Sequence, residues 1–375
     1  MNVLLVTTAK NLAEKLNALN PEIEYAAIVV DNVEAAKKTL VQVGLSKCFV
    51  SSMDELMKCI EYLWYDYVVC VTDEWQLSLP NKVKGYNIPK NKLVDFWALD
   101  RPHNFLLERA LRYCKEHIAE VEMFATGPSR VENSIDPAKF RRKTFNFGSP
   151  SQDLYYNFLV AKQVILYGEG HNKLRYALIG LAPYIFHYDL SSTQYVQVAI
   201  LRQFIAFKDL HNFSMSTDVY EKFFRKEWLN KKLPLESVDP NNLLEAKVNR
   251  SMTKEEIASN IAISPWAGKS YPETRNENIK ILYDYLTLCE ENNIRPVMFT
   301  MPVTEKHMGV FNKQMLAEFY VLVGQALSKH PSARFFDGYN LQGFTYADFF
   351  DHTHLNAHGA AKFSIHLNDF IEQLD

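Results

Sequence analysis

Apolar residues recur along the first part of the chain in two alternating patterns. Short runs rich in β-branched residues predict buried strands at residues 3–6, 25–30, 48–50 and 67–71. Apolar positions three and four residues apart predict helices between them, at residues 12–19, 33–43 and 53–63. Because strands that alternate with helices form a parallel sheet with helices on both faces, we expect residues 1–118 to fold as an α/β domain.

A second series of the same patterns begins after a helix predicted at residues 105–117, where we place the domain boundary. Strands are predicted at residues 121–125, 144–147, 176–181, 296–300 and 333–336, and helices at residues 154–166, 279–292 and 315–329. The alternation predicts a three-layer α/β domain over residues 119–375. From about residue 184 to 271 a segment rich in Phe, Tyr and Leu predicts a helical insertion, which would form a lid, an acceptor cleft or a dimer surface.

The last predicted helix has its own start signal. Asn356 is a suitable N-cap, and apolar residues follow it at helical spacing: Ala360, Phe363, Leu367, Phe370, Ile371 and Leu374. This apolar stripe predicts that the helix packs against the sheet. The loop before the helix is then held in place, which is what a general base requires.

That loop carries a carboxylate and an imidazole. Asp351 stands three positions before His354, so a turn brings both side chains to one face. A carboxylate that orients an imidazole, which takes the proton of a serine, is the arrangement of a serine hydrolase. We therefore interpret Ser129 as the nucleophile, His354 as the base and Asp351 as the group that orients the base. Ser149 and Ser151 fit a nucleophile equally well on chemistry alone, and chain order and strand context favour Ser129.

Two glycines lie close to this serine in the predicted fold. Gly127 permits a tight turn before Ser129, whose backbone N–H would point outward at the start of a helix. Gly148 ends the next strand and has no Cβ, so its N–H can approach a substrate carbonyl closely. We expect the N–H groups of Ser129 and Gly148 to form the oxyanion hole.

Composition excludes several classes of function. A net charge of -3 and an isoelectric point near 6.4 argue against nucleic-acid binding. Five cysteines without a C-x-x-C pair indicate a reducing compartment. The chain shows no basic leader and no apolar run long enough to span a membrane, so we expect a cytoplasmic protein without an integral membrane segment. The sequence Thr7-Thr8-Ala9-Lys10 follows the first strand where a dinucleotide site needs glycines, so we favour a structural or docking role for this domain and expect no cofactor.

The histidines around Asp351 offer a metal site as an alternative. His354 and His358 are four positions apart, as helix-borne ligands often are, and His352 is nearby. Because a helix start at Asn356 separates them and no H-E-x-x-H motif is present, we assign no metal ligand. Elsewhere near the serine, Arg130 and Glu132 are expected at the surface by ordinary exposure statistics.

Together these residues resemble a known superfamily. Gly127-Pro128-Ser129, Gly148 after the second strand, and Asp351 and His354 before the final helix resemble the SGNH (GDSL-type) hydrolases over residues 119–375. Two further phrases are most similar to the DltD-like branch, which acts on cell-envelope glycans: Phe145-Asn146-Phe147-Gly148-Ser149 and Trp266 through Asn278. The first domain resembles small Rossmann-like domains of surface-polysaccharide biosynthesis proteins, through Asp66-Tyr67 and Ile88-Pro89.

The resemblance implies a flavodoxin-like second domain and a catalytic triad of Ser129, His354 and Asp351. The implied activity is that of an esterase or O-acyltransferase on an acylated carbohydrate or glycan, through an acyl-Ser129 intermediate. It leaves open a homo-oligomer or a partner in a biosynthetic complex. The chain departs from the family where Pro128 replaces the usual aspartate and where Gly180-Leu181-Ala182-Pro183 replaces the block that supplies an oxyanion asparagine. A catalytically silent glycan-binding or assembly module is therefore the alternative.

Overall fold

The computed structural model describes residues 1–71, 88, 92–95, 106–171, 173–190, 212, 223, 237–242, 248–259 and 272–375. The chain divides into two compact units, Met1–Glu108 with Ser191–Leu235, and Arg109–Leu190 with Glu236–Asp375. The break between them along the chain falls inside helix α5 (Leu106–His117), close to the predicted boundary at residue 118. Most of the insertion predicted at residues 184–271 lies outside the described residues.

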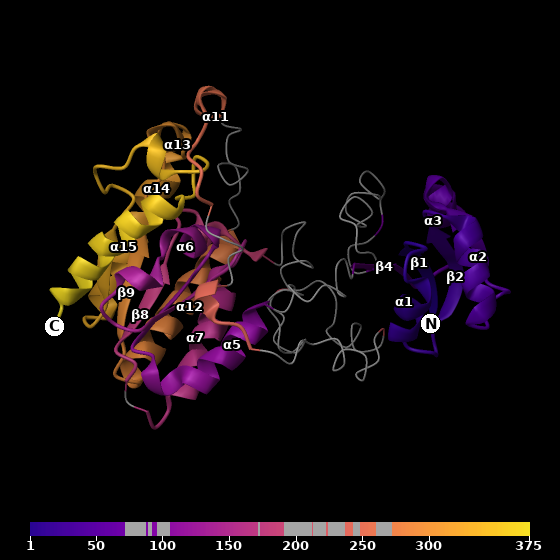
Figure 1. Cartoon of the computed structure of the whole chain (residues 1–375), viewed down its shortest axis with the longest axis horizontal. Helices are drawn as coiled ribbons and strands as arrows, with labels where there is room; N and C mark the ends of the chain where they lie inside the picture. The colour runs from indigo at the N-terminus through magenta and orange to yellow at the C-terminus, as the bar shows by residue number, and fades with distance from the viewer. Residues whose placement is uncertain are drawn as a thin grey trace. The chain divides into compact units, whose positions relative to one another are not determined.

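The first unit contains a parallel five-stranded sheet. Its strands β1 (Asn2–Thr7), β2 (Glu24–Val30), β3 (Val50–Ser52), β4 (Tyr67–Val71) and β5 (Leu93–Asp95) lie in the order β3-β2-β1-β4-β5. Figure 1 labels three of these strands, β1, β2 and β4. Helices α1 (Leu12–Ala18), α2 (Val33–Gln42) and α3 (Leu56–Tyr62) connect the first four strands. This is the Rossmann-like order expected from the alternating pattern.

Helices cover both faces of the central strand β1, and the side chains of this strand are apolar on both faces. Val3 and Leu5 belong to the cluster that includes residues of α1 and α2, whereas Leu4 and Val6 pack with residues of α3. Successive side chains of a strand point to opposite faces, so a strand buried on both sides reads as a continuous apolar run. The short strand β5 has only three residues, and its pattern did not predict a strand.

One residue from late in the chain completes the core of the first unit. The Phe223 side chain is fully buried in the cluster around β1 and β4, and its ring meets that of Tyr67 edge to face at 5.4 Å. The backbone N–H of Asn20 donates to the Phe223 carbonyl at 2.8 Å. The first unit is therefore built from two separate stretches of the chain.

The second unit has a parallel sheet of the flavodoxin-like order. Its strands β6 (Met123–Gly127), β7 (Thr144–Gly148), β8 (Tyr176–Gly180), β9 (Arg295–Thr300) and β10 (Arg334–Asp337) are arranged β10-β9-β8-β6-β7. Besides α5, the α-helices described in this unit are α6 (Ser129–Ser134), α7 (Leu154–Gly168), α11 (Lys254–Ala258), α12 (Pro272–Glu291), α13 (Glu305–Val310), α14 (Lys313–Lys329) and α15 (Ala357–Glu372). The α/β fold class expected from the sequence is confirmed for both units.

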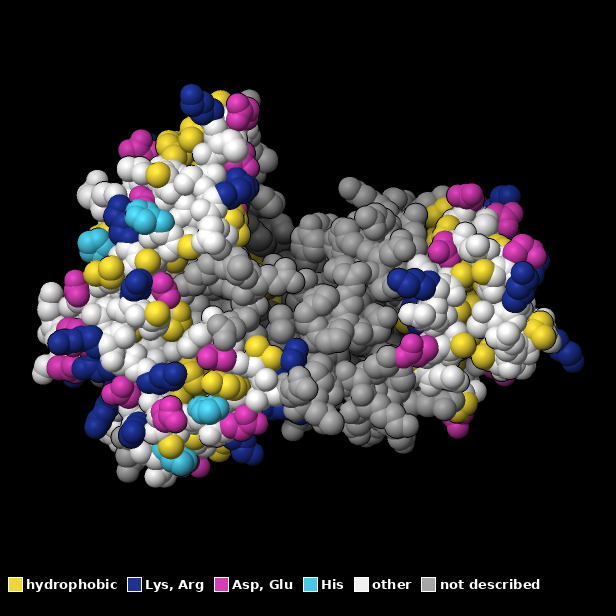
Figure 2. Space-filling view, viewed as in Figure 1, with side chains coloured by type: hydrophobic (Ala, Val, Ile, Leu, Met, Phe, Trp, Pro, Cys, Tyr) yellow, Lys and Arg dark blue, Asp and Glu magenta, His cyan; other side chains and the backbone are white. Residues whose placement is uncertain are grey.

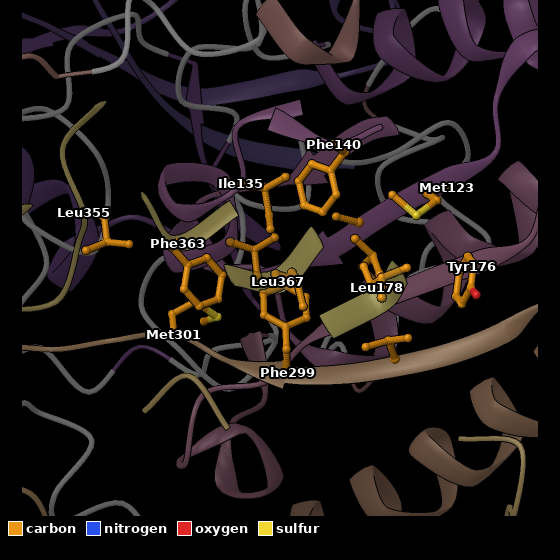
Figure 3. Close-up of a cluster of buried hydrophobic side chains, with 14 of the residues drawn as sticks. Met123, Ile135, Phe140, Tyr176, Leu178, Phe299, Met301, Leu355, Phe363 and Leu367 are labelled. Carbon is orange, nitrogen blue, oxygen red and sulfur yellow. The ribbon is translucent and has the colours of Figure 1, made fainter. Parts of the chain in front are cut away.

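Helices α6 and α15 cover one face of the second sheet. Phe363 and Leu367 of α15 pack with Leu178 and Phe299 of the sheet in the cluster shown in Figure 3, where the rings of Phe299 and Phe363 lie 6.0 Å apart. Burial of each such side chain contributes about 1.5 to 3 kcal/mol. The helix begins as predicted, because the Asn356 side chain accepts the Gly359 N–H at 3.0 Å.

The opposite face is covered by α7 and α12, which pack against each other. Tyr285 of α12 reaches the sheet, where its hydroxyl lies 3.0 Å from that of Thr126 in β6. Helix α12 begins at Pro272, whereas the sequence predicts a start at residue 279. The apolar pattern did not reveal the first turns of the helix because their residues are polar. One of these polar residues, Asn278, is buried and donates to the carbonyls of Ile185, Phe186 and Tyr188. It thereby fixes the segment that follows β8.

The described surface mixes charges of both signs. On the face drawn in Figure 2, Lys and Arg side chains alternate with Asp and Glu over both units. In the part of the chain that the structure describes, none of the helices has the length and apolar character needed to cross a membrane.

Candidate active site

Ser129 lies at the carboxyl edge of the second sheet, where α6 begins directly after β6. Three glycines, Gly127, Gly148 and Gly180, end the adjacent strands and let this helix approach the sheet. A methyl group at Gly127 or Gly180 would overlap the Val131 side chain of α6, and one at Gly148 would overlap the backbone of Glu132. Only residues without a Cβ therefore allow α6 to hold Ser129 at this position.

Ser129, His354 and Asp351 form one hydrogen-bonded series. The Ser129 Oγ lies 2.8 Å from His354 Nε2, and His354 Nδ1 lies 2.8 Å from Asp351 Oδ2. Because an ionised carboxylate only accepts, His354 Nδ1 carries the proton and Nε2 is left to accept from the serine hydroxyl. The side chain of His354 is 22% exposed, so a substrate can reach this pair.

The loop before α15 holds Asp351 as an ion. Its Oδ1 accepts the backbone N–H groups of Thr353 at 2.7 Å and His354 at 2.9 Å, and the Thr353 hydroxyl at 3.0 Å. Burial acts to raise the pKa of Asp351, but the His354 ring and the Thr353 donors outweigh it and hold the pKa well below its ordinary value. The ring of His354 also stacks on Phe350, with centroids 5.5 Å apart.

The two backbone groups expected in an oxyanion hole differ in their surroundings. Pro128 precedes α6 without a side-chain cap, and no acceptor for the Ser129 N–H occurs among the described residues. The Gly148 N–H instead donates to Asn146 Oδ1 at 2.9 Å. An oxyanion would have to compete with this amide oxygen, so the role of Gly148 stays a prediction.

The sequence predicts Arg130 at the surface, and this prediction is wrong. The residue is 5% exposed, and its guanidinium lies 3.3 Å from His307 Nε2 and 5.4 Å above the Tyr184 ring centre. Exposure statistics failed here because Tyr184 follows β8 and His307 lies in α13, so both partners are distant in sequence. Glu132, by contrast, is half-buried.

The histidines weighed as metal ligands point to separate partners. His354 is engaged by Ser129 and Asp351, whereas His352 Nδ1 pairs with the Thr304 hydroxyl at 2.9 Å. His358 Nδ1 lies 2.8 Å from Asp348. Within the described ranges, no three His, Cys, Asp or Glu residues are grouped to hold a metal ion.

A cavity of about 650 Å³ opens at the other edge of the sheet. It is lined by Glu122, which precedes β6, and by Thr144, which begins β7, together with Arg141 and Lys143. Arg142 also lines the cavity, and its guanidinium is paired with Glu372 and Asp375. Because Ser129 follows the carboxyl end of β6, this cavity is separate from the candidate active site.

Sequence reasoning missed the residues that surround the triad. Asn146 is a polar residue inside the apolar strand β7, and its buried amide also donates to the Val131 and Ile135 carbonyls at 3.4 and 3.3 Å. A polar residue inside an otherwise apolar strand was the signal in the sequence that could have identified Asn146. His307 gave none, because α13 is short and was not predicted.

Comparison of the whole sequence with protein-family models finds no match, and comparison with curated proteins finds none either. Assignment of a function to this chain therefore depends on the geometry of the described residues and on the motifs already quoted.

Proposed function

We propose that the second unit is an SGNH-like serine esterase or O-acyltransferase that acts on an acylated carbohydrate or cell-envelope polymer precursor. The observation that supports the proposal is the series Ser129, His354 and Asp351, with 2.8 Å at each step. Two segments from distant parts of the chain meet to form it: the start of α6, and the loop before α15. The expected location remains the cytoplasm.

In the proposed reaction, His354 Nε2 takes the Ser129 proton as the oxygen attacks the ester carbonyl. The new Oγ–carbon bond gives a tetrahedral oxyanion, and its collapse breaks the ester bond. His354 gives the proton to the departing alcohol, which leaves an acyl-Ser129. Water, or the hydroxyl of a second carbohydrate, then attacks the acyl group and gives its proton to His354. Collapse of the second tetrahedral intermediate breaks the bond between the acyl carbon and Ser129 Oγ, and His354 returns the proton to Oγ. Asp351 stays ionised and stabilises the imidazolium at each step.

The Ser129 N–H is the first donor for the oxyanion, because it has no acceptor among the described residues. Gly148 N–H is the second if the oxyanion displaces Asn146 Oδ1. Loss of one such donor costs about 100-fold or more in rate.

The test is turnover of p-nitrophenyl acetate together with labelling by a fluorophosphonate probe. Ser129→Ala should lower hydrolysis by about a thousandfold or more and abolish labelling, because the nucleophile is removed. Ser149→Ala is the matched control, since this neighbouring serine has an equivalent hydroxyl, and it should keep both signals. Equal turnover by the wild type and Ser129→Ala would rule the proposal out.

The second candidate is a catalytically silent glycan-binding or assembly module. It is favoured by the Gly148 N–H bond to Asn146, which occupies a predicted oxyanion donor. For this function, the purified chain would bind glycans equally with and without Ser129→Ala and would take up no fluorophosphonate. Labelling at Ser129 would exclude it.

A further inference from the structure

Arg130 is buried, and no carboxylate lies within ion-pair distance of its guanidinium in the part of the chain that the structure describes. Its guanidinium contacts the neutral ring of Tyr184 and a ring nitrogen of His307. A buried, unpaired charge is unfavourable by several kcal/mol, so such groups are normally paired. Arg130 directly follows the proposed nucleophile, which makes its missing partner relevant to the substrate.

His307 does not supply the negative charge that would neutralise Arg130. Arginine only donates, so His307 Nε2 must accept the hydrogen bond from Arg130. Burial and the adjacent Arg130 charge lower the pKa of His307 to about 3, so the ring is neutral. The imidazole therefore orients the guanidinium without neutralising it.

The hydroxyl of Tyr339 is a second buried polar group in this part of the fold. Tyr339 is 2% exposed, and its buried hydroxyl has no hydrogen-bond partner among the residues that the structure describes. The Tyr339 ring lies 6.5 Å from that of Phe311, and the Phe311 ring lies 5.9 Å from that of His307, so Tyr339 belongs to the same cluster as Arg130. The charge of Arg130 also acts against the rise in the pKa of Tyr339 that burial causes. A buried hydroxyl without a partner is unfavourable by about 1 to 3 kcal/mol. An acceptor that met both groups would satisfy them together.

Arg130 and Tyr339 both lie at the edge of the sheet that carries Ser129. Arg130 is the second residue of α6, after β6, and Tyr339 follows β10. Between them lie Tyr184, after β8, and His307, after β9, so the guanidinium extends along the carboxyl ends of the strands. The backbone N–H of His307 donates to the Thr304 hydroxyl at 3.3 Å, and this hydroxyl lies 2.9 Å from Nδ1 of His352, which directly follows Asp351, so the cluster lies beside the triad.

We propose that Arg130 and the Tyr339 hydroxyl bind an anionic group of the substrate, a carboxylate or a phosphate, next to the ester that Ser129 attacks. Arg130 has two N–H edges that match the oxygens of either group. His307 is the positioning residue for the guanidinium. The identification of the anion as part of a substrate rests on the proposed esterase or acyltransferase function.

The first test compares two esters of equal acyl length, p-nitrophenyl butyrate and mono-p-nitrophenyl succinate. Wild type should prefer the anionic ester by about ten- to hundredfold in kcat/KM, the size of a charged hydrogen bond. Arg130→Met should reduce this ratio to about one, and Arg130→Lys should restore part of it. Arg295→Met is the control, because Arg295 also lies over a tyrosine ring, at 6.0 Å from Tyr176, but at the amino end of β9. It should keep the wild-type ratio.

The second test measures binding without turnover. The full chain carrying Ser129→Ala is titrated with sodium phosphate, sodium acetate or sodium chloride at equal ionic strength, and its thermal unfolding is followed. A saturable rise in Tm with phosphate or acetate, absent with chloride and lost on adding Arg130→Met, supports the site and tells which anion it takes. Tyr339→Phe removes only an unpartnered hydroxyl, so it should fold normally and weaken anion binding several-fold.

The inference is overturned if neither anion shifts Tm beyond chloride, or if the ester ratio is the same in wild type and Arg130→Met. Absence of hydrolysis with both esters, while the anion still binds through Arg130, would remove the proposed function but retain the anion site. The two failures are thus distinguishable.

Discussion

The Asp351 side chain shows how one residue can be prepared for its role by its nearest neighbours. Two backbone N–H groups and the Thr353 hydroxyl all point at the same carboxylate oxygen, which leaves the other oxygen to His354. Because these donors come from the next three residues, the short loop itself fixes the carboxylate. Arg130 is the opposite case, since the partners that its guanidinium meets among the described residues, His307 and Tyr184, come from distant elements.

At the residue scale, His307 predicts a pH dependence of stability. Its pKa of about 3 in the folded chain lies below the ordinary value of about 6.5, so only the unfolded chain binds this proton between the two. The free energy of unfolding should therefore fall with decreasing pH, by up to about 1.4 kcal/mol per pH unit from this group. Asp351 and the other carboxylates with lowered pKa values add their loss only below about pH 4.

Urea unfolding between about pH 6.5 and 4.5 separates the contribution of His307 from that of the carboxylates. His307→Asn should flatten the dependence, because asparagine does not titrate, and His366→Asn, at an exposed position, should leave it unchanged. Parallel curves for wild type and His307→Asn would contradict a neutral, buried His307.

At the element scale, α6 is positioned by contact with strand ends that have no side chains. The same Val131 side chain lies against Gly127 and Gly180, so helix and sheet meet at backbone distance. Interiors packed this closely respond to a single added methyl group.

Gly180→Ala should destabilise the chain by about 1 to 3 kcal/mol, because the new methyl group overlaps Val131. Adding Val131→Ala should relieve the overlap, so the double variant should be more stable than the sum of the single changes predicts, by about 1 kcal/mol. Denaturant unfolding measures all four species. Additive effects would mean that the overlap is not the cause.

Gly324→Ala provides the control for this series. Gly324 lies on the exposed side of α14, and nothing lies within contact of an added Cβ. Because alanine favours a helix over glycine, this change should stabilise the chain by about 0.5 to 1 kcal/mol.

At the scale of the whole molecule, the chain builds two units that are not two simple segments. Phe223 belongs to the core of the first unit although the first strand of the second unit begins a hundred residues earlier. The chain therefore returns to the first unit after the second has begun, and the first unit is complete only when both stretches are present.

Phe223→Ala should destabilise the first unit by about 3 to 5 kcal/mol, because it leaves a cavity beside Tyr67. Hydrogen exchange should then be faster at amides of β1 and β4 and unchanged at those of β8 and β9. Phe319→Ala, which removes a buried ring of α14, should give the reverse pattern. Equal acceleration in both units after either change would show that they unfold as one.

The sequence by itself determined the α/β class, the position of nearly every strand in the two sheets and the loops from which Ser129, His354 and Asp351 come. These features depend on the period of apolar residues and on turn residues, which act over a few neighbouring positions. The three-residue strand β5 and the polar start of α12 escaped because their patterns are too short or too polar to differ from a loop.

Only the tertiary structure decided which groups meet. It joined Ser129 to a histidine 225 positions away, paired the Gly148 N–H with Asn146, and buried Arg130 against His307, 177 positions away. Burial and hydrogen bonding depend on elements brought together by the sheet order, which no local pattern encodes. The environment of each reactive group, and with it the anion site inferred beside the serine, is therefore a property of the fold and not of the motif.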